Sequence, residues 1–294
     1  MKADLEAFIV SNQSFINQAM IEKIQKTTIP TPLKESMLYS IKAGGKRIRP
    51  ILMIASAEAF GGKKDDVLSA ALALEMIHTY SLIHDDLPAM DDDHLRRGQP
   101  TNHIQFDEAT AILAGDAFLT MAFQIISEDE HLSAEQRIKI INRLSLAAGP
   151  SGMVAGQILD FQAENKTISL NEMERIHDLK TGKLLIYAME IGAYIAGASE
   201  MELEAVKTCG QYMGLIFQIQ DDILDVQGQE SKIGKKVGSD LNNEKSTYPK
   251  LLGIEASIKE KDKNVLLAKQ VLENANISSS ILTHFIDYLS SRDS

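Results

Sequence analysis

Two aspartate-rich segments contain the side chains best suited to chemistry in this sequence of 294 residues. One of them, DDILD at residues 221–225, follows an apolar run in which unpaired carboxylates would be costly to bury. On a helix, Asp221 and Asp225 share one face, and Asp222 is turned about 100° away from it. Such a pair can coordinate Mg²⁺ and leave other ligand positions for water and a substrate oxygen. An isolated motif of this kind is usually a solvated helix end, but the apolar setting favours a metal-binding role.

The other segment, DDLPAMD at residues 85–91, requires a break in its helix. Asp85 and Asp91 are six residues apart and would lie on different faces of a straight helix. Pro88 opposes continuation of the helix. The sequence therefore predicts a turn that brings Asp91 back beside Asp85. A calcium EF-hand does not fit, because its alternating ligands followed by glycine are missing.

Basic residues lie close to both acidic segments in the sequence. They are the cations of GGKRIRP (44–50), Arg96, Arg97, the KTGK segment (180–183), Lys235, Lys236 and Lys245. Glycines followed by cations at an expected helix start suit a phosphate group. Each cation alone would be read as a solvated charge. Their clustering in a chain of formal net charge -11 indicates that Mg²⁺ bridges carboxylates to one polyanion while Lys and Arg hold another.

The elements that position these residues are predicted to be helices. Apolar residues recur at three- and four-residue spacing, and sustained alternation of the strand kind is absent. The helices over 67–86, 109–127 and 210–226 are apolar nearly all round and are expected to be buried. Further helices are predicted over 3–25, about 32–43, Pro50 to the Gly61-Gly62 break, 133–148, 171–198, 201–209, 246–258 and 263–274. No linker or shift in composition divides the chain, which predicts one all-α domain over residues 1–294.

Composition limits the partners and the compartment. The acidic balance disfavours nucleic acid and anionic membrane surfaces. Cys209 is the single cysteine, and we expect an inert thiol that forms no internal disulfide or thiolate cluster. No secretory signal is evident, and Gly115 and Asp116 interrupt the apolar stretch 109–126. We therefore expect a cytoplasmic protein without nucleic-acid partners or integral membrane association, and a frayed tail at Arg292.

Several segments, in a fixed order along the chain, carry a family resemblance. They are GGKRIRP (44–50), IHTYSLIH (77–84), Arg96-Arg97-Gly98, Lys180-Thr181-Gly182, QIQDDILD (218–225), Gly238-Ser239-Asp240 and KSTY (245–248). Together with the two residues inserted between Asp86 and Asp91, relative to DDxxD, this set resembles the short-chain isoprenyl diphosphate synthases, particularly bacterial farnesyl diphosphate synthases. The resemblance implies the isoprenoid synthase fold, a single-domain helical bundle around a deep central cavity, and a homodimer.

The resemblance also implies a reaction. Dimethylallyl and then geranyl diphosphate would condense head to tail with isopentenyl diphosphate through an allylic cation. The proton would be lost to the departing diphosphate, so no protein general base is demanded. Asp85, Asp91 and Asp221 would ligate Mg²⁺, three ions per active site, on the allylic diphosphate, supported by Asp86, Asp222 and Asp225.

The remaining roles follow from the same resemblance. Arg96, Lys180 and either Lys235 or Lys236 would hold the allylic diphosphate, and Lys46, Arg49, His78 and Arg97 the diphosphate of isopentenyl diphosphate without metal. Lys180, Thr181 and Gln218 would stabilise the allylic cation, and Lys245 would lie near the allylic carbon.

Tyr80, five residues before Asp85, resembles the floor of a fifteen-carbon site, and packing of the core is the alternative. A geranyl or geranylgeranyl diphosphate synthase is the nearest alternative enzyme. A non-catalytic regulatory subunit of a heteromeric synthase would generally have lost an aspartate motif, and both are complete here. A class I terpene cyclase needs only one diphosphate site, which disagrees with the Lys46, Arg49 and Arg97 set.

Overall fold

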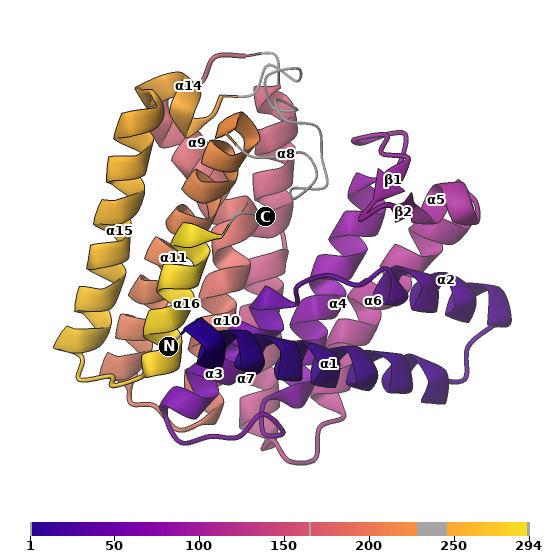
Figure 1. Ribbon diagram of the computed structural model, residues 1–294. Helices are drawn as coiled ribbons and strands as arrows, with labels where there is room; N and C mark the ends of the chain where they lie inside the picture. The colour runs from indigo at the N-terminus through magenta and orange to yellow at the C-terminus, as the bar shows by residue number, and fades with distance from the viewer. Residues whose placement is uncertain (1, 165, 228–245, 293–294) are drawn as a thin grey trace. The chain divides into compact units, whose positions relative to one another are not determined.

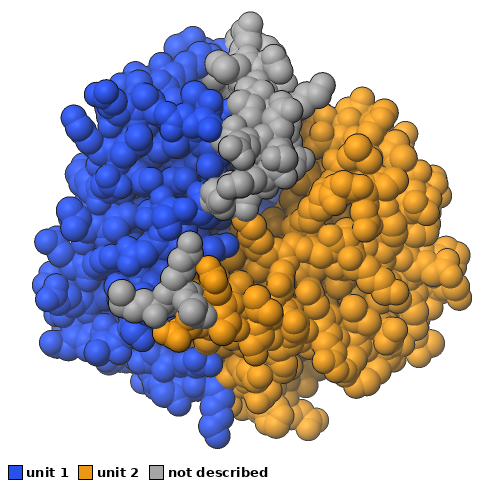
Figure 2. Space-filling view, in the orientation of Figure 1, with its two compact units in different colours: residues 1, 55–63, 142–294 blue, residues 2–54, 64–141 orange. Residues whose placement is uncertain are grey.

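The computed structural model describes residues 2–164, 166–227 and 246–292, and its elements are almost entirely helical (Figure 1). The all-α prediction is confirmed. The chain forms two compact units, coloured separately in Figure 2. Unit 1 comprises residues 1, 55–63 and 142–294, and unit 2 comprises residues 2–54 and 64–141. One domain over residues 1–294 and a central cavity stay predictions.

Unit 2 is built around α4, which packs along α6. Its elements are α1 (Lys2–Lys26), α2 (Thr31–Lys42), α4 (Leu68–Asp85), β1 (Leu95–Arg96), β2 (Gln99–Pro100), α5 (Asn102–Gln105) and α6 (Glu108–Ser127). The two short strands pair in antiparallel register. Gly115 permits the close approach of α6 to α4, because a Cβ there would lie 2.1 Å from His84 Nε2. The same imidazole nitrogen lies 3.1 Å from the Ile112 carbonyl oxygen.

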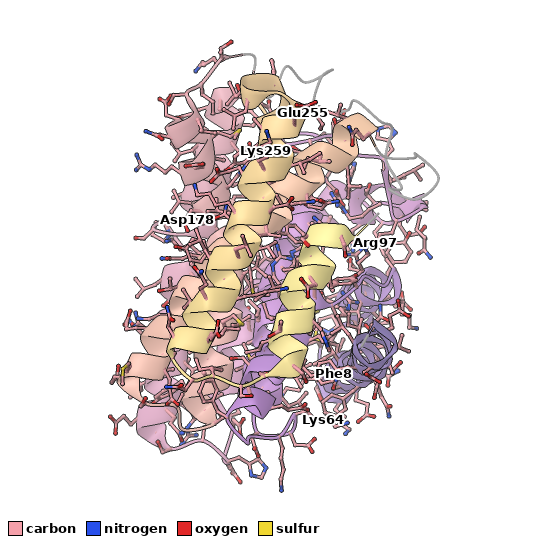
Figure 3. The ribbon with its side chains drawn as sticks, turned by 60° about the vertical axis from the view of Figure 1, so that its left-hand side comes forward. Phe8, Lys64, Arg97, Asp178, Glu255 and Lys259 are labelled. Atoms are coloured by element: carbon pink, nitrogen blue, oxygen red, sulfur yellow. The ribbon has the colours of Figure 1, made fainter. Side chains whose placement is uncertain are left out.

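Unit 1 is built around α11, which packs against α10, α15 and α16. Its elements are α8 (Met153–Ala163), α9 (Leu170–His177), η1 (Asp178–Gly182), α10 (Lys183–Ile195), α11 (Glu200–Gln227), α14 (Tyr248–Leu252), α15 (Ile254–Asn274) and α16 (Ser280–Ser291). Figure 3 shows α15, which carries Glu255 and Lys259 one turn apart, running beside α16. Two further helices, α3 (Ile48–Ala59) and α7 (Ala134–Ala148), contribute residues to both units.

Several predicted helix boundaries are wrong. The helices 201–209 and 210–226 are one, α11, because Gly210 lies in its interior: a Cβ there would be 3.1 Å from Ile186 Cα on α10. The helix over 246–258 ends at Gly253, whose φ of 82° is easily adopted by glycine, and α15 then runs without the expected break. The helices α5, α8 and α16 were not predicted.

One helix among the described residues, α6, is long and apolar enough to cross a bilayer. The helix is only partly buried, and its buried residues include Ala111, Phe118 and Ile126. The packing of this face along α4 is the ordinary arrangement of a core helix.

Candidate functional site

The first acidic segment forms the turn that Pro88 predicted. The backbone N–H of Asp91 donates to the Asp85 carbonyl oxygen at 2.9 Å, and those of Met90 and Asp92 donate to the Leu87 carbonyl at 2.8 and 3.2 Å. Asp91 is thereby returned to the end of α4, where Asp85 is the last helical residue. The two aspartates, separated on an ideal helix, are neighbours through the backbone of this turn.

Asp86 has a different environment from Asp85 and Asp91. Its carboxylate is 3% exposed as a residue and accepts from Arg96 Nε at 2.7 and 2.9 Å, with a further bond from Nη2. Burial raises the pKa of Asp86, and the Arg96 guanidinium opposes that shift. Arg96 also lies 3.6 Å from an Asp93 carboxylate oxygen. Asp86 therefore anchors β1 to the end of α4.

The predicted basic residues of unit 2 gather around the loop between α2 and α3. Arg97 donates to the Gly44 carbonyl, and a Cβ on Gly45 would lie 2.5 Å from the Arg97 guanidinium. Burial holds the pKa of His78 well below its usual value, and Arg49 and Arg97 lower it further. His78 is therefore a neutral imidazole at pH 7 amid positive charge, and the cluster is suited to an anion.

A pocket of about 250 Å³ in unit 1 brings together five residues predicted from distant parts of the sequence. Its lining includes Lys180, Thr181, Gln218, Asp221 and Asp222. Among the described residues, no three His, Cys, Asp or Glu side chains form a metal site alone. The donors that are present suit Mg²⁺, which takes one or two carboxylates and completes its shell with water and substrate phosphate.

Asp222 is the structural member of the second acidic segment. It is 6% exposed, and its Oδ2 accepts from the backbone N–H of Tyr248 at 2.8 Å. This bond ties α11 to the first turn of α14. Asp225 is half-buried and is not among the lining residues of the pocket.

The helix predicted over 171–198 contains a turn of π-helix at Lys180, η1. Lys180 Nζ lies 2.6 Å from Asp160 Oδ2, a carboxylate on α8 that sequence reasoning missed because α8 itself was not predicted. Extra-wide turns of this kind often occur at functional sites. Two glycines allow neighbouring helices to approach η1: a Cβ on Gly214 would be 3.1 Å from Gly182 Cα, and one on Gly156 only 2.3 Å from Lys180 N.

Gly156→Ala is expected to destabilise the protein by about 1–3 kcal/mol, the usual cost of overpacking. The new Cβ would meet the backbone of η1, not the end of a flexible side chain, so Lys180 would also be displaced. Urea unfolding measures the loss of stability. Gln162→Ala, at an exposed position of the same helix, is the control. Equal stability of the two variants would contradict this packing.

Arg292 is not in a frayed tail, so that prediction is wrong. Its guanidinium packs over the Phe217 ring at 3.9 Å, donates to the Phe217 carbonyl at 3.0 Å and pairs with Asp221 Oδ1. The Arg292 carbonyl accepts from Gln220 Nε2 at 2.9 Å. The sequence offered no signal for this, because a lone arginine after a helix is usually solvated. The contact places a cation on a predicted magnesium ligand.

Other predicted residues are placed as follows. Lys46 is exposed, and Tyr80 is 8% exposed with its pKa raised by burial and by Asp85. Cys209 is buried, which raises the pKa of its thiol to about 12 and agrees with an inert thiol. Lys235, Lys236 and Lys245 lie outside the described residues.

Comparison with known proteins adds independent findings. A family model for polyprenyl synthetase matches residues 30–285. The chain is 45% identical over 295 residues to the farnesyl diphosphate synthase of Bacillus subtilis (strain 168), covering 100% of both chains. It is 52% identical over 256 residues to that of Micrococcus luteus, covering 86% of this chain and 87% of the relative. The crystal structure of an FPP/GFPP synthase from Zymomonas mobilis superposes with a TM-score of 0.84, at 32% identity and 99% coverage of each chain.

Proposed function

This chain belongs to the polyprenyl synthetase family and is a prenyltransferase, and we propose that it makes farnesyl diphosphate. The reaction would extend dimethylallyl diphosphate by two successive condensations with isopentenyl diphosphate. Relatives of high identity over most of the chain carry the farnesyl diphosphate synthase name, which supports this product.

The pocket of unit 1 is the observation that carries the proposal. An enzyme that ionises an allylic diphosphate needs carboxylates for metal ions, a cation for the leaving group and dipoles for the carbocation. In the pocket lining, Asp221 is the carboxylate and Lys180 is the cation. Thr181 and Gln218 supply the dipoles. Lys180 is held by Asp160 at 2.6 Å, so its charge is oriented before a substrate arrives.

Asp85, Asp91 and Asp221 are the residues that would hold Mg²⁺, three ions per active site, in this proposal. When bound, the metal ions would neutralise the diphosphate leaving group as Lewis acids. Asp86 accepts hydrogen bonds from Arg96, and Asp222 accepts one from the backbone N–H of Tyr248. Through these bonds the two aspartates would keep the ends of α4 and α11 in place.

The basic cluster of unit 2 would hold the diphosphate of isopentenyl diphosphate without metal. Its proposed ligands are Lys46, Arg49, His78 and Arg97. A neutral His78 can donate one N–H to a phosphate oxygen, and the arginines supply the positive charge. Two diphosphate sites of different chemistry separate a condensing enzyme from a cyclase, which needs one.

We also propose a cytoplasmic homodimer. Ile112 and Leu113 of α6 are 42% and 59% exposed, and an apolar pair of this kind suits a subunit interface. Sedimentation velocity tests the dimer.

Incubation with Mg²⁺, dimethylallyl diphosphate and labelled isopentenyl diphosphate tests the proposed function. We expect farnesol after dephosphorylation of the products, and no labelled product in EDTA. Geraniol or geranylgeraniol as the main alcohol would identify the alternative synthases. No elongation under any metal condition would contradict the proposal and favour a regulatory subunit.

Arg292→Ala is expected to tighten Mg²⁺ binding by up to about fivefold, the range of a partly exposed ion pair. The metal and the guanidinium would share Asp221, so removing the cation leaves the carboxylate to the metal. Calorimetric titration with Mg²⁺, in the presence of inorganic diphosphate and without turnover, measures the change. Arg292→Lys keeps the charge and serves as control. Weaker binding in Arg292→Ala would show that Arg292 assists the metal site.

A further inference from the structure

Arg47 lies in the middle of the basic loop, yet its side chain is turned into the protein. The residue is 4% exposed, and its backbone φ is 52°, in the left-handed region that a non-glycine residue adopts at some cost. The adjacent Lys46 is exposed. A strained backbone that persists at an arginine indicates that the side-chain contacts hold it there.

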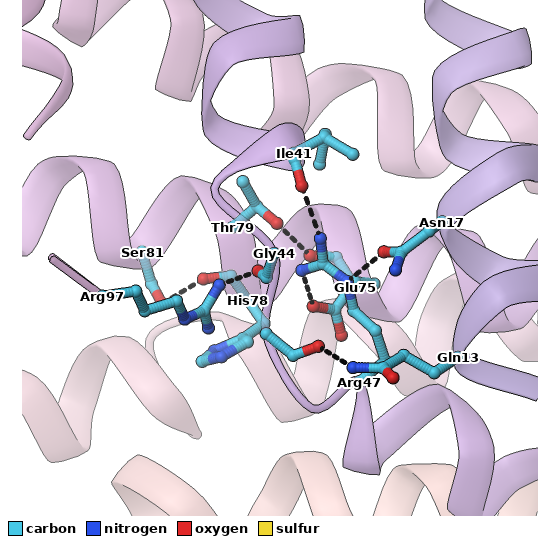
Figure 4. A network of polar contacts seen from close by, with 11 residues as sticks. Gln13, Asn17, Ile41, Gly44, Arg47, Glu75, His78, Thr79, Ser81 and Arg97 are labelled. Atoms are coloured by element: carbon cyan, nitrogen blue, oxygen red, sulfur yellow. Dashed lines mark hydrogen bonds and ion pairs between the residues drawn. The ribbon is translucent and has the colours of Figure 1, made fainter. Parts of the chain in front are cut away.

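The Arg47 guanidinium joins three helices of unit 2 (Figure 4). Its Nε donates to Asn17 Oδ1 on α1 at 2.8 Å, Nη2 to the Ile41 carbonyl on α2 at 2.8 Å, and Nη1 to Glu75 Oε1 on α4 at 2.7 Å. The side chains of Arg47 and Glu75 are each 2% exposed. Every nitrogen of the guanidinium therefore has a protein partner, which argues against a role as a direct diphosphate ligand.

The neighbours of this ion pair are the residues proposed to bind isopentenyl diphosphate. Lys46 directly precedes Arg47 in the loop, Arg49 follows it by two residues in the first turn of α3, and His78 lies three residues after Glu75, on the next turn of α4. Figure 4 shows the Arg97 side chain reaching Gly44 at the start of the loop.

The loop backbone is held at further points beside the ion pair. Gln13 Nε2 on α1 donates to the Gly45 carbonyl at 2.7 Å, and Arg97 donates to the Gly44 carbonyl. The loop conformation is thus determined by contacts from α1 and α4, and Arg47 is its central connection.

We propose that Arg47 and Glu75 are positioning residues for the second diphosphate: they hold Lys46 and Arg49 in register with His78. This inference rests on the proposed function. A buried ion pair can often be replaced by apolar residues without loss of stability, so stability alone does not account for the Arg47–Glu75 pair. A positioning role does account for it, because the pair fixes the loop between α2 and α3. Ligands displaced by as little as an ångström bind a diphosphate poorly.

The test is the double variant Arg47→Met with Glu75→Leu, which replaces the pair by apolar side chains of similar size. We expect the KM for isopentenyl diphosphate to rise by about 10- to 100-fold, with the KM for dimethylallyl diphosphate within about twofold of wild type. The melting temperature is measured on the same samples. Arg47→Lys, which keeps the charge but not the planar fork, is expected to fall between wild type and the double variant.

Glu190→Gln is the matched control, because Glu190 is a buried carboxylate paired with Arg143 at 3.2 Å in unit 1. It is expected to leave the KM for isopentenyl diphosphate unchanged. An unchanged KM in the double variant, whatever its melting temperature, would overturn the positioning role. If the double variant does not fold, the KM for isopentenyl diphosphate is measured for Glu75→Gln and Arg47→Lys instead. An unchanged KM in both would overturn the positioning role.

Equilibrium titration separates this inference from the proposed function. Inorganic diphosphate is titrated in EDTA into wild type and each variant, with no allylic substrate. Weaker binding in the variants supports the positioning role even if wild type fails to elongate a prenyl chain. Equal binding in wild type and variants overturns it.

Discussion

Asp221→Asn is expected to lower kcat for prenyl transfer by about 10³-fold, or about 4 kcal/mol of transition-state stabilisation. Asparagine has nearly the same shape but lacks the charge that a magnesium ion needs. Asp221 lines the pocket together with Lys180 and is 43% exposed at its side chain, so a metal ion can reach it. Steady-state kinetics with saturating Mg²⁺ measures the loss.

Asp287→Asn is the control for this variant. Asp287 lies on α16 of the same unit, is 51% exposed and pairs with Lys269 outside the pocket lining. It is expected to keep wild-type kcat. A similar kcat in Asp221→Asn and Asp287→Asn would remove Asp221 from the metal site.

Tyr80→Ala is expected to make the product longer than fifteen carbons. Tyr80 lies five residues before Asp85 on α4, which corresponds to about 7.5 Å along the helix axis. The ring is buried, and it meets His84 edge to face with centroids 5.7 Å apart. Removing the ring would open space below the first acidic turn for another isoprene unit. Chromatography of the dephosphorylated alcohols measures the product distribution.

Tyr80→Phe keeps the ring and is expected to keep farnesol as the main product. Farnesol alone from Tyr80→Ala would show that Tyr80 only packs the core. A large loss of total activity in both variants, without a change in length, would assign Tyr80 to folding.

The sequence predicted the parts of this site that depend on local chain geometry. Pro88 was sufficient for the turn that returns Asp91 to Asp85, because proline beyond the first turn of a helix opposes its continuation. The apolar pattern was likewise sufficient for the buried α4. Both features can be predicted from neighbouring residues in the sequence, without knowing which distant residues they contact.

Features that depend on packing between helices were missed or wrong. The predicted helix boundary at Gly210 is wrong, because this glycine lets α10 approach the middle of α11. The partners Asp160 of Lys180 and Arg292 of Asp221 lie 20 and 71 residues away in the chain. Spacing within one segment contains no information about such contacts, and the resemblance to known synthases implied no role for Asp160 or Arg292.

The most direct test of two chemically different diphosphate sites is a pair of calorimetric titrations, each with and without Mg²⁺. Isopentenyl diphosphate is one ligand, and a non-ionising thiolodiphosphate analogue of dimethylallyl diphosphate is the other. We expect isopentenyl diphosphate to bind equally well in Mg²⁺ and in EDTA, and the allylic analogue to bind only with Mg²⁺. Metal dependence of both ligands, or of neither, would contradict the assignment of the acidic and basic clusters.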